Sequence, residues 1–208
     1  MKKKIGKLHV LTDTVLQIRF SHVQLTEMAI HGGADTIQFR QKTGSSREMI
    51  DLARKMRALC ADRGAAFIVN DRVDIALACN AHGVHLGQDD FPIPLARKLL
   101  GADRIIGGSA STLEEARECV SDGADYVGFG PVYPTSSKDD AGPVRGIEIL
   151  EQLAAQIPVP VIAIGGIDAG NTPEIMRAGA HGIAVISAVC CKQDPEAAAR
   201  TLREALMK

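Results

Sequence analysis

The feature that most constrains the fold of this chain is the regular alternation of short apolar runs with longer segments of helical periodicity. Eight runs have the length and the aliphatic or β-branched content of buried strands. They are residues 8–11, 36–39, 66–69, 83–86, 105–107, 126–129, 161–164 and 182–186. Apolar strands separated by helices indicate a parallel sheet that is covered on both faces. One unit recurs about every 26 residues in the 208-residue chain, and eight such units close into a barrel.

The pattern leaves a second topology open, because local periodicity does not record whether a sheet closes. A doubly wound open sheet shows the same alternation, but no Gly-x-Gly-x-x-Gly motif follows the first run. We therefore predict an α/β fold, a single (β/α)8 TIM barrel over residues 1–208, without a domain linker.

Helix boundaries are also marked. Apolar residues recur at spacings of three and four over residues 46–61, and Thr112 followed by Glu115 predicts a capping box for a helix over 114–120. Pro173 lies where a first helical turn would begin. Four glycines, Gly33, Gly64, Gly123 and Gly179, fall where helices should end.

Composition excludes several classes of function. The net charge of -1 gives no global attraction for nucleic acid or a membrane surface. Lys2-Lys3-Lys4 is not followed by a long apolar stretch, and no run approaches the roughly 18 apolar residues of a membrane span. The five cysteines form no Cys-x-x-Cys motif, which favours reduced thiols. We expect a cytoplasmic enzyme without a nucleic-acid or membrane partner.

Polar residues follow several of the predicted strands. The clearest stretches are Gln38-Phe39-Arg40-Gln41-Lys42, Asn70-Asp71-Arg72, Gly87-Gln88-Asp89-Asp90, Thr135-Ser136-Ser137-Lys138 and Gly165-Gly166. In a barrel, the C-terminal ends of the strands surround one pocket. That pocket would hold carboxylates for a cation beside basic and hydroxyl groups for phosphate, which suggests an enzyme that handles a phosphorylated substrate with a divalent metal.

Two of these stretches suit a diphosphate and a metal. Gln38, Arg40 and Lys42 alternate by two and share one face of an extended segment, although a solvated strand end would look the same. Asp71 and Asp90 offer oxygen ligands for Mg²⁺, which needs few protein ligands. Each carboxylate could instead cap the helix that follows it.

The remaining signals come from glycines, a long loop and histidines. Gly165-Gly166 suits phosphate binding by backbone N–H groups, or else a tight turn. Residues 130–146 form a long non-periodic stretch, which favours an active-site loop. His82 and His85 would point to opposite faces of a strand, so core or surface histidines are favoured over a metal site. The sequence reveals no Ser-His-Asp or Cys-His arrangement.

Six blocks of this sequence closely resemble the thiamine-phosphate synthase family. They are residues 38–42, 70–76, 83–90, 123–131, 134–138 and 163–167, in family order over nearly the whole chain. The resemblance implies a TIM barrel with Mg²⁺ as cofactor. It also implies a transferase that joins a hydroxymethylpyrimidine diphosphate to a thiazole phosphate and releases pyrophosphate, through a pyrimidine-methyl cation. The partners would be these small molecules, and a homo-oligomer is possible.

The resemblance also assigns residues. Asp71 and Asp90 match the metal ligands. The pyrimidine-diphosphate contacts correspond to Gln38, Arg40, Lys42, Asn70, Ser109 and Lys138. The thiazole-phosphate side corresponds to Thr135, Ser137, Gly166, Ile186 and Ser187. Of these residues, Lys138, Arg40 and Ser109 would take part in catalysis.

Three positions depart from the family pattern: Gln41 stands where Glu is usual, Gly108 where an aliphatic residue is usual, and Ser111 where His is common. The thiazole tautomerases share the barrel and use a His at the place of Ser111. Because this chain lacks that His and keeps Asp90, the synthase is preferred. A non-catalytic phosphate-binding regulator would not require two carboxylates beside Lys and Arg.

Overall fold

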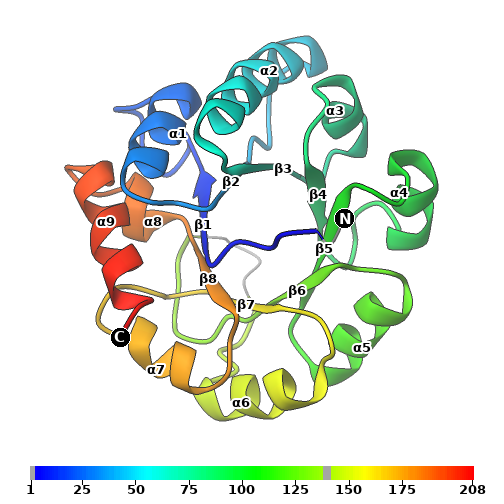
Figure 1. Ribbon diagram of the computed structural model, residues 1–208, viewed down its shortest axis with the longest axis vertical. Coiled ribbons are helices and arrows are strands. Elements are labelled where there is room, and N and C mark those ends of the chain that lie inside the picture. The colour runs from blue at the N-terminus through cyan, green and yellow to red at the C-terminus, as the bar shows by residue number, and fades with distance from the viewer. Residues whose placement is uncertain (1–2, 138–141) are drawn as a thin grey trace.

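Eight parallel strands close into a barrel in chain order in the computed structural model, which describes residues 3–137 and 142–208 (Figure 1). The strands are β1 (Leu8–Thr12), β2 (Thr36–Phe39), β3 (Ala66–Asn70), β4 (Gly83–Leu86), β5 (Ile105–Ala110), β6 (Tyr126–Phe129), β7 (Val161–Ile164) and β8 (Gly182–Val185). Pairing of Leu8 with Ile183 and of Val10 with Val185 joins β1 to β8. The closed barrel confirms the predicted (β/α)8 fold and excludes the open doubly wound sheet.

Helices surround the strands as an outer ring (Figure 1). They are α1 (His22–His31), α2 (Ser46–Arg63), α3 (Val73–Ala78), α4 (Ile93–Leu100), α5 (Leu113–Ser121), α6 (Ile147–Gln156), α7 (Thr172–Arg177), α8 (Ser187–Cys190) and α9 (Pro195–Ala205). The largest error in a predicted strand lies in β5, which continues through Gly108, Ser109 and Ala110. Glycine and serine have low strand propensity, but here Ser109 and Ala110 pair with β6.

The predicted helix signals mostly hold. Pro173 lies in the first turn of α7, and Gly64 ends α2 in the left-handed conformation. The capping box at Thr112 is only half formed. The Thr112 side chain accepts a hydrogen bond from the backbone N–H of Glu115 (3.1 Å), but the Glu115 carboxylate accepts from the N–H of Ser111 (2.6 Å) and not from that of Thr112.

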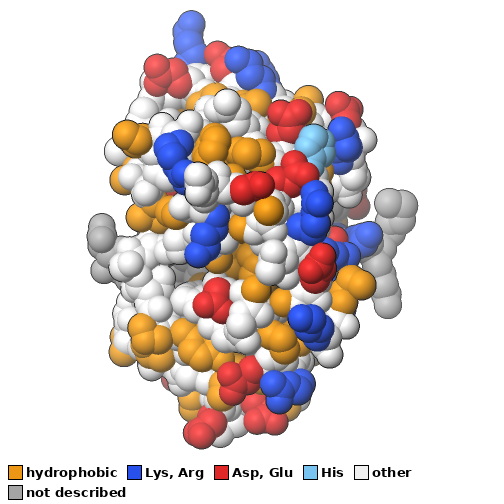
Figure 2. All heavy atoms as spheres, turned by 90° about the vertical axis from the view of Figure 1, so that its left-hand side faces the viewer, with side chains coloured by type: hydrophobic (Ala, Val, Ile, Leu, Met, Phe, Trp, Pro, Cys, Tyr) orange, Lys and Arg blue, Asp and Glu red, His pale blue; other side chains and the backbone are white. Residues whose placement is uncertain are grey.

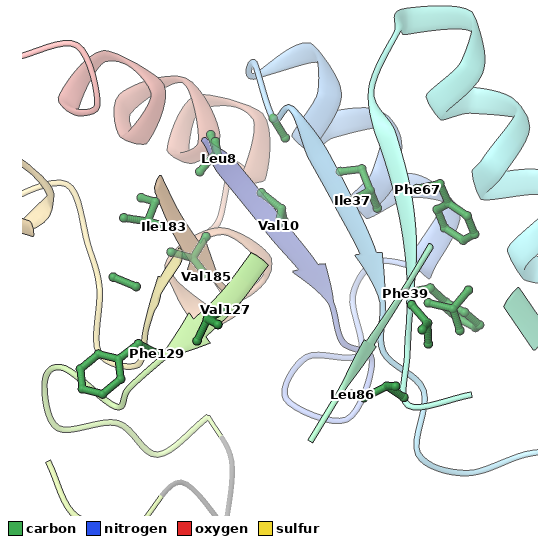
Figure 3. Packing of buried hydrophobic residues seen from close by; sticks show 14 of the residues in the cluster. Leu8, Val10, Ile37, Phe39, Phe67, Leu86, Val127, Phe129, Ile183 and Val185 are labelled. Atoms are coloured by element: carbon green, nitrogen blue, oxygen red, sulfur yellow. The ribbon is translucent and has the colours of Figure 1, made fainter. Parts of the chain in front are cut away.

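Alternate residues of the strands face opposite sides of the barrel wall. One set, including Leu8, Val10, Ile37 and Phe39, packs in the apolar layer between strands and helices (Figure 3). A smaller cluster, Ile68, Ile105, Tyr126 and Ile162, lies apart from that layer and packs against Ile5 of the N-terminal segment. The helix-facing layer therefore supplies most of the hydrophobic burial, and the other face of the wall carries this smaller apolar cluster together with buried polar residues such as His9 and Gln38.

The molecular surface carries both signs of charge. Figure 2 shows the side of α1 and α9, where basic and acidic side chains are interspersed with small apolar patches. Within the described residues, no helix is both long and apolar enough to cross a membrane.

Candidate active site

A pocket of about 380 Å³ lies within the ring formed by the C-terminal ends of the strands. It brings together every described residue to which the sequence assigned a role. Those lining residues are Gln38, Arg40, Lys42, Asn70, Asp71, Asp90, Ser109, Thr135, Ser137, Gly166, Ile186 and Ser187. Lys138 lies outside the described residues. The shared location follows from the fold, and the role of each side chain stays a prediction.

Arg40 is held at one wall of the pocket by a buried carboxylate. Asp13, which follows β1 and is 1% exposed, forms an ion pair with the Arg40 guanidinium. The other Asp13 oxygen accepts hydrogen bonds from the N–H groups of Val15 (2.8 Å) and Leu16 (3.0 Å). A guanidinium fixed in this way loses little freedom when it binds an anion. Asp13 was not predicted from the sequence, because no local pattern links it to Arg40, 27 positions away.

Two polar atoms beside this ion pair are buried without a partner among the described residues: Gln38 Oε1 and Arg40 Nε. An unsatisfied buried polar atom costs about 1–3 kcal/mol. Because both residues line the pocket, a bound ligand could satisfy them. The wall thus offers an acceptor and a charged donor to a substrate.

Asp71 and Asp90 meet at the ends of β3 and β4. Lys42 Nζ lies 2.6 Å from Asp71 Oδ2, and the Asp90 carboxylate accepts a hydrogen bond from the N–H of Gly87 (2.6 Å). Asp71 has a left-handed backbone, with φ of 64°, which is uncommon for a residue other than glycine. The capping alternative is wrong for both carboxylates, because α3 and α4 lack a side-chain cap among the described residues.

The Asp90 carboxylate disfavours a negative charge on Asp71. Burial raises the pKa of Asp71, Lys42 lowers it, and Asp90, within hydrogen-bonding reach, raises it again, so that the pKa lies above its ordinary value. A proton or a cation between the carboxylates would relieve this repulsion. Within the described residues, however, no group of three or more His, Cys, Asp and Glu side chains could hold a metal ion. A cation here would therefore need further oxygens from water or substrate.

Hydroxyl groups and glycines form the opposite wall, after β6, β7 and β8. Ser137 donates a hydrogen bond to Ser187 (3.0 Å), and Thr135 accepts one from the backbone N–H of Ser137 (3.2 Å). Gly166 has φ of 65°, and a Cβ there would lie 2.5 Å from the Pro134 carbonyl oxygen. The tight turn is therefore observed at Gly166, which also lines the pocket, and phosphate binding by its backbone N–H stays a prediction.

Ser109, His85 and Tyr126 form a hydrogen-bonded chain in the pocket. His85 Nε2 lies 2.9 Å from Ser109 Oγ, and His85 Nδ1 lies 2.9 Å from the Tyr126 hydroxyl. The sequence showed no Ser-His-Asp or Cys-His arrangement, and the structure adds a Ser–His pair that no local pattern indicated. Residues 24 positions apart on neighbouring strands meet only when the sheet forms. The third member is a phenol and not the carboxylate of a serine triad.

Arg145 is a basic residue of the pocket that the sequence analysis missed. Its backbone N–H donates to the Pro131 carbonyl (2.8 Å), and its Nη2 donates to Ser111 Oγ (3.0 Å). Among the described residues, Arg145 has no ion-pair partner and its Nε is buried without a hydrogen bond. Ser111, which stands where the family commonly has His, is therefore the residue that the Arg145 guanidinium contacts.

The other two departures lie outside the pocket lining. Gln41 donates to the Thr43 carbonyl (2.8 Å). A Cβ at Gly108 would lie 2.6 Å from Cys119 Sγ, so the α5 cysteine occupies the space that an aliphatic side chain at 108 would need. Burial raises the pKa of Cys119 to about 11, which keeps that thiol protonated near neutral pH.

Comparison with known proteins agrees with this geometry. The family model described as thiamine monophosphate synthase matches residues 8–189. The chain belongs to this family. Among the relatives, the thiamine-phosphate synthase of Salinibacter ruber is 51% identical over 205 residues, covering 99% of this chain and 90% of that protein. The thiamine-phosphate synthase of Methanocella arvoryzae is 50% identical over 196 residues, covering 94% and 92%.

A solved structure of the family shares the fold closely. Thiamine phosphate pyrophosphorylase from Pyrococcus furiosus superimposes with a TM-score of 0.89 and 42% identity, covering 97% of this chain and 95% of that one. The family resemblance drawn from the sequence motifs is confirmed. The relatives' names favour the synthase over the thiazole tautomerase.

Proposed function

We propose that this protein is a transferase that joins 4-amino-2-methyl-5-hydroxymethylpyrimidine diphosphate to a thiazole phosphate, forming thiamine phosphate and pyrophosphate. One observation carries the proposal. A single pocket has a basic wall with two carboxylates at β2–β4, and a wall of hydroxyls and glycines after β6–β8. Two substrates that each carry phosphate could bind there at the same time with their rings between the walls.

The basic wall suits the diphosphate. Arg40, fixed by Asp13, offers a preorganised fork of donors, and Lys42 adds a point charge. Gln38 and Asn70 contribute amide groups beside them. Fixed donors at the place where negative charge develops lower the barrier to departure of pyrophosphate. We assign the same task to Lys138, and Ser109 would add a hydroxyl.

Asp71 and Asp90 fit Mg²⁺, because two close carboxylates disfavour joint ionisation and the remaining ligands would be water and diphosphate oxygens. Mg²⁺, when bound, would supply Lewis-acid neutralisation of the charge on the departing pyrophosphate. Lys42, 2.6 Å from Asp71, would then be released toward the phosphate oxygens.

The other wall suits the thiazole phosphate, with Thr135, Ser137 and Ser187 as hydroxyl donors and Gly166 leaving room for a close approach. Ile186 would contact the ring. Loss of pyrophosphate leaves a pyrimidine-methyl cation, which the thiazole nitrogen captures. This route needs no enzymic nucleophile. It does need exclusion of water, and residues 130–146 could contribute to that.

A coupled assay tests the proposal. The protein with both substrates and Mg²⁺ should form thiamine phosphate and pyrophosphate in equal amounts, and EDTA should abolish turnover. Incubation with a thiazole tautomer alone should give no catalysed isomerisation, because Ser111 stands where the tautomerases use a His and its hydroxyl accepts a hydrogen bond from the Arg145 guanidinium. Fast isomerisation without coupling would move the function to the tautomerases. A cytoplasmic location, a single-domain organisation and a homo-oligomeric state stay predictions.

A further inference from the structure

In the hydrogen-bonded chain of Ser109, His85 and Tyr126, the His85 and Tyr126 side chains are buried, and the proposed reaction assigns them no role. Tyr126 is 1% exposed and His85 is 8% exposed. The two rings stack with centroids 5.4 Å apart, in addition to their hydrogen bond. Both residues line the pocket, as does Ser109.

Two glycines make room for this chain. A Cβ at Gly107 would lie 2.2 Å from Tyr126 Cζ and 2.5 Å from His85 Nδ1, and a Cβ at Gly128 would lie 3.0 Å from His85 Cε1. Glycine inside a strand weakens it, and branched aliphatic residues usually fill a barrel interior. Glycine at these two positions of β5 and β6 therefore removes side chains from the barrel interior, and the space is filled by the His85 imidazole and the Tyr126 phenol.

The direction of the hydrogen bonds follows from proton counting. A neutral imidazole has one N–H, so of the hydrogen bonds that His85 makes with Ser109 and Tyr126, one is donated and the other accepted. Burial raises the pKa of Tyr126 far above its ordinary value, and the phenol keeps its proton. Among the described residues, that hydroxyl forms its hydrogen bond with His85 Nδ1. If the phenol donates to Nδ1, the imidazole proton must lie on Nε2, facing Ser109.

We propose that His85 and Tyr126 are positioning residues that act through Ser109. Tyr126 fixes the tautomer of His85, and His85 Nε2–H donates to Ser109 Oγ. The Ser109 proton is then directed into the pocket, toward the diphosphate of the pyrimidine substrate. The opposite tautomer would make His85 a base for Ser109, as in a serine nucleophile. This inference rests on the proposed function, because Ser109 matters here only as a donor to the leaving group.

A double-mutant cycle between Tyr126 and Ser109 tests the proposal. Tyr126→Phe keeps the ring that packs over Gly107 and removes only the hydroxyl. It should lower kcat about tenfold, as expected when a transition-state donor is misdirected but not deleted, with little change in KM for the pyrimidine diphosphate. In a Ser109→Ala background the same change should have almost no effect, since its target is gone.

Tyr133→Phe is the matched control. It removes the other tyrosine hydroxyl of the chain, which donates to Glu174 (2.8 Å) outside the pocket lining, and its kcat should stay within about twofold, a change too small for a lost transition-state contact. Equal kcat losses from Tyr126→Phe with and without Ser109 would overturn the proposal, because the hydroxyl would then act independently of Ser109. Failure of the wild-type protein to couple the substrates would instead refute the proposed function itself.

A second pair of variants decides the question if Tyr126→Phe does not fold. His85→Gln keeps an amide N–H that can reach Ser109, whereas His85→Leu removes every donor. The proposal expects His85→Gln to retain at least several times the kcat of His85→Leu at matched melting temperature. Equal activity of the two variants would refute it.

Discussion

Asp71→Asn should leave the metal-free protein at least as stable as the wild type while weakening its response to Mg²⁺. Asn tolerates the left-handed backbone at this position, where φ is 64°, so the substitution adds little strain. It removes the negative charge that burial and Asp90 disfavour. Lys42 loses its partner, but its side chain is 49% exposed and stays hydrated.

The direction of the expected stability change follows from the pH dependence of folding stability. The folded-state pKa of Asp71 lies above the ordinary value of 3.8, so folding disfavours the ionised carboxylate. Stability contributed by this group is highest below pH 3.8 and falls as pH rises through the raised folded-state pKa, after which the deficit is constant. Without metal, the Asn variant should lack this loss at neutral pH.

In Mg²⁺, the wild-type protein should have a higher Tm than the Asp71→Asn variant, the reverse of the order without metal. A ligand at 100 times its Kd stabilises the native state by about 2.7 kcal/mol. At roughly 2–4 °C per kcal/mol for a chain of this size, that raises the Tm by about 5–10 °C. If Asp71→Asn weakens binding tenfold, it forfeits about 1.4 kcal/mol, or roughly 3–6 °C of that increase.

Thermal melts in EDTA measure the stability of the metal-free proteins. Melts in Mg²⁺, and in Mg²⁺ with pyrophosphate, measure how much ligand binding raises the Tm. Asp89→Asn is the matched control, because it neutralises an exposed carboxylate in the same loop as Asp90 and should keep the full shift. A wild-type-sized Mg²⁺ shift in Asp71→Asn would show that Asp71 holds no metal. A lower Tm in EDTA would contradict the argument from repulsion.

Three further predictions follow from the pocket. Lys138→Ala should lower kcat by about 10²–10³ with little change in Tm, and a loss within about threefold in steady-state kinetics would make Lys138 a surface charge only. Gly166→Ala should lower the Tm and raise KM for the thiazole phosphate, because a Cβ would lie 2.5 Å from the Pro134 carbonyl oxygen; unchanged values would exclude a close approach of phosphate there. Arg145→Met keeps the apolar stem and removes a guanidinium that lines the pocket. Substrate affinity measured by calorimetry should fall about tenfold, the size of a lost charge-assisted hydrogen bond. Equal affinity would show that Arg145 only anchors its loop through Ser111.

Much of this fold could be predicted from local sequence patterns. Strand positions follow from apolar runs, and helix ends follow from glycines with positive φ, such as Gly33 at 98° and Gly179 at 89°. The strand-end motifs also predicted which residues would share a pocket, because parallel strands in a barrel direct their C-terminal ends to one side. The alternation of Gln38, Arg40 and Lys42 needed nothing beyond the period of a strand.

Side-chain contacts between different strands were decided only by the tertiary structure. The register of β1 with β2 brings Asp13 to Arg40, and the register of β4 with β5 brings His85 to Ser109. Arg145 reaches Ser111 across 34 residues. A sequence records which groups follow each strand, but partners depend on the shear and register of the closed sheet, which no single segment encodes. The pocket could therefore be predicted as a set of residues, whereas its hydrogen bonds could not.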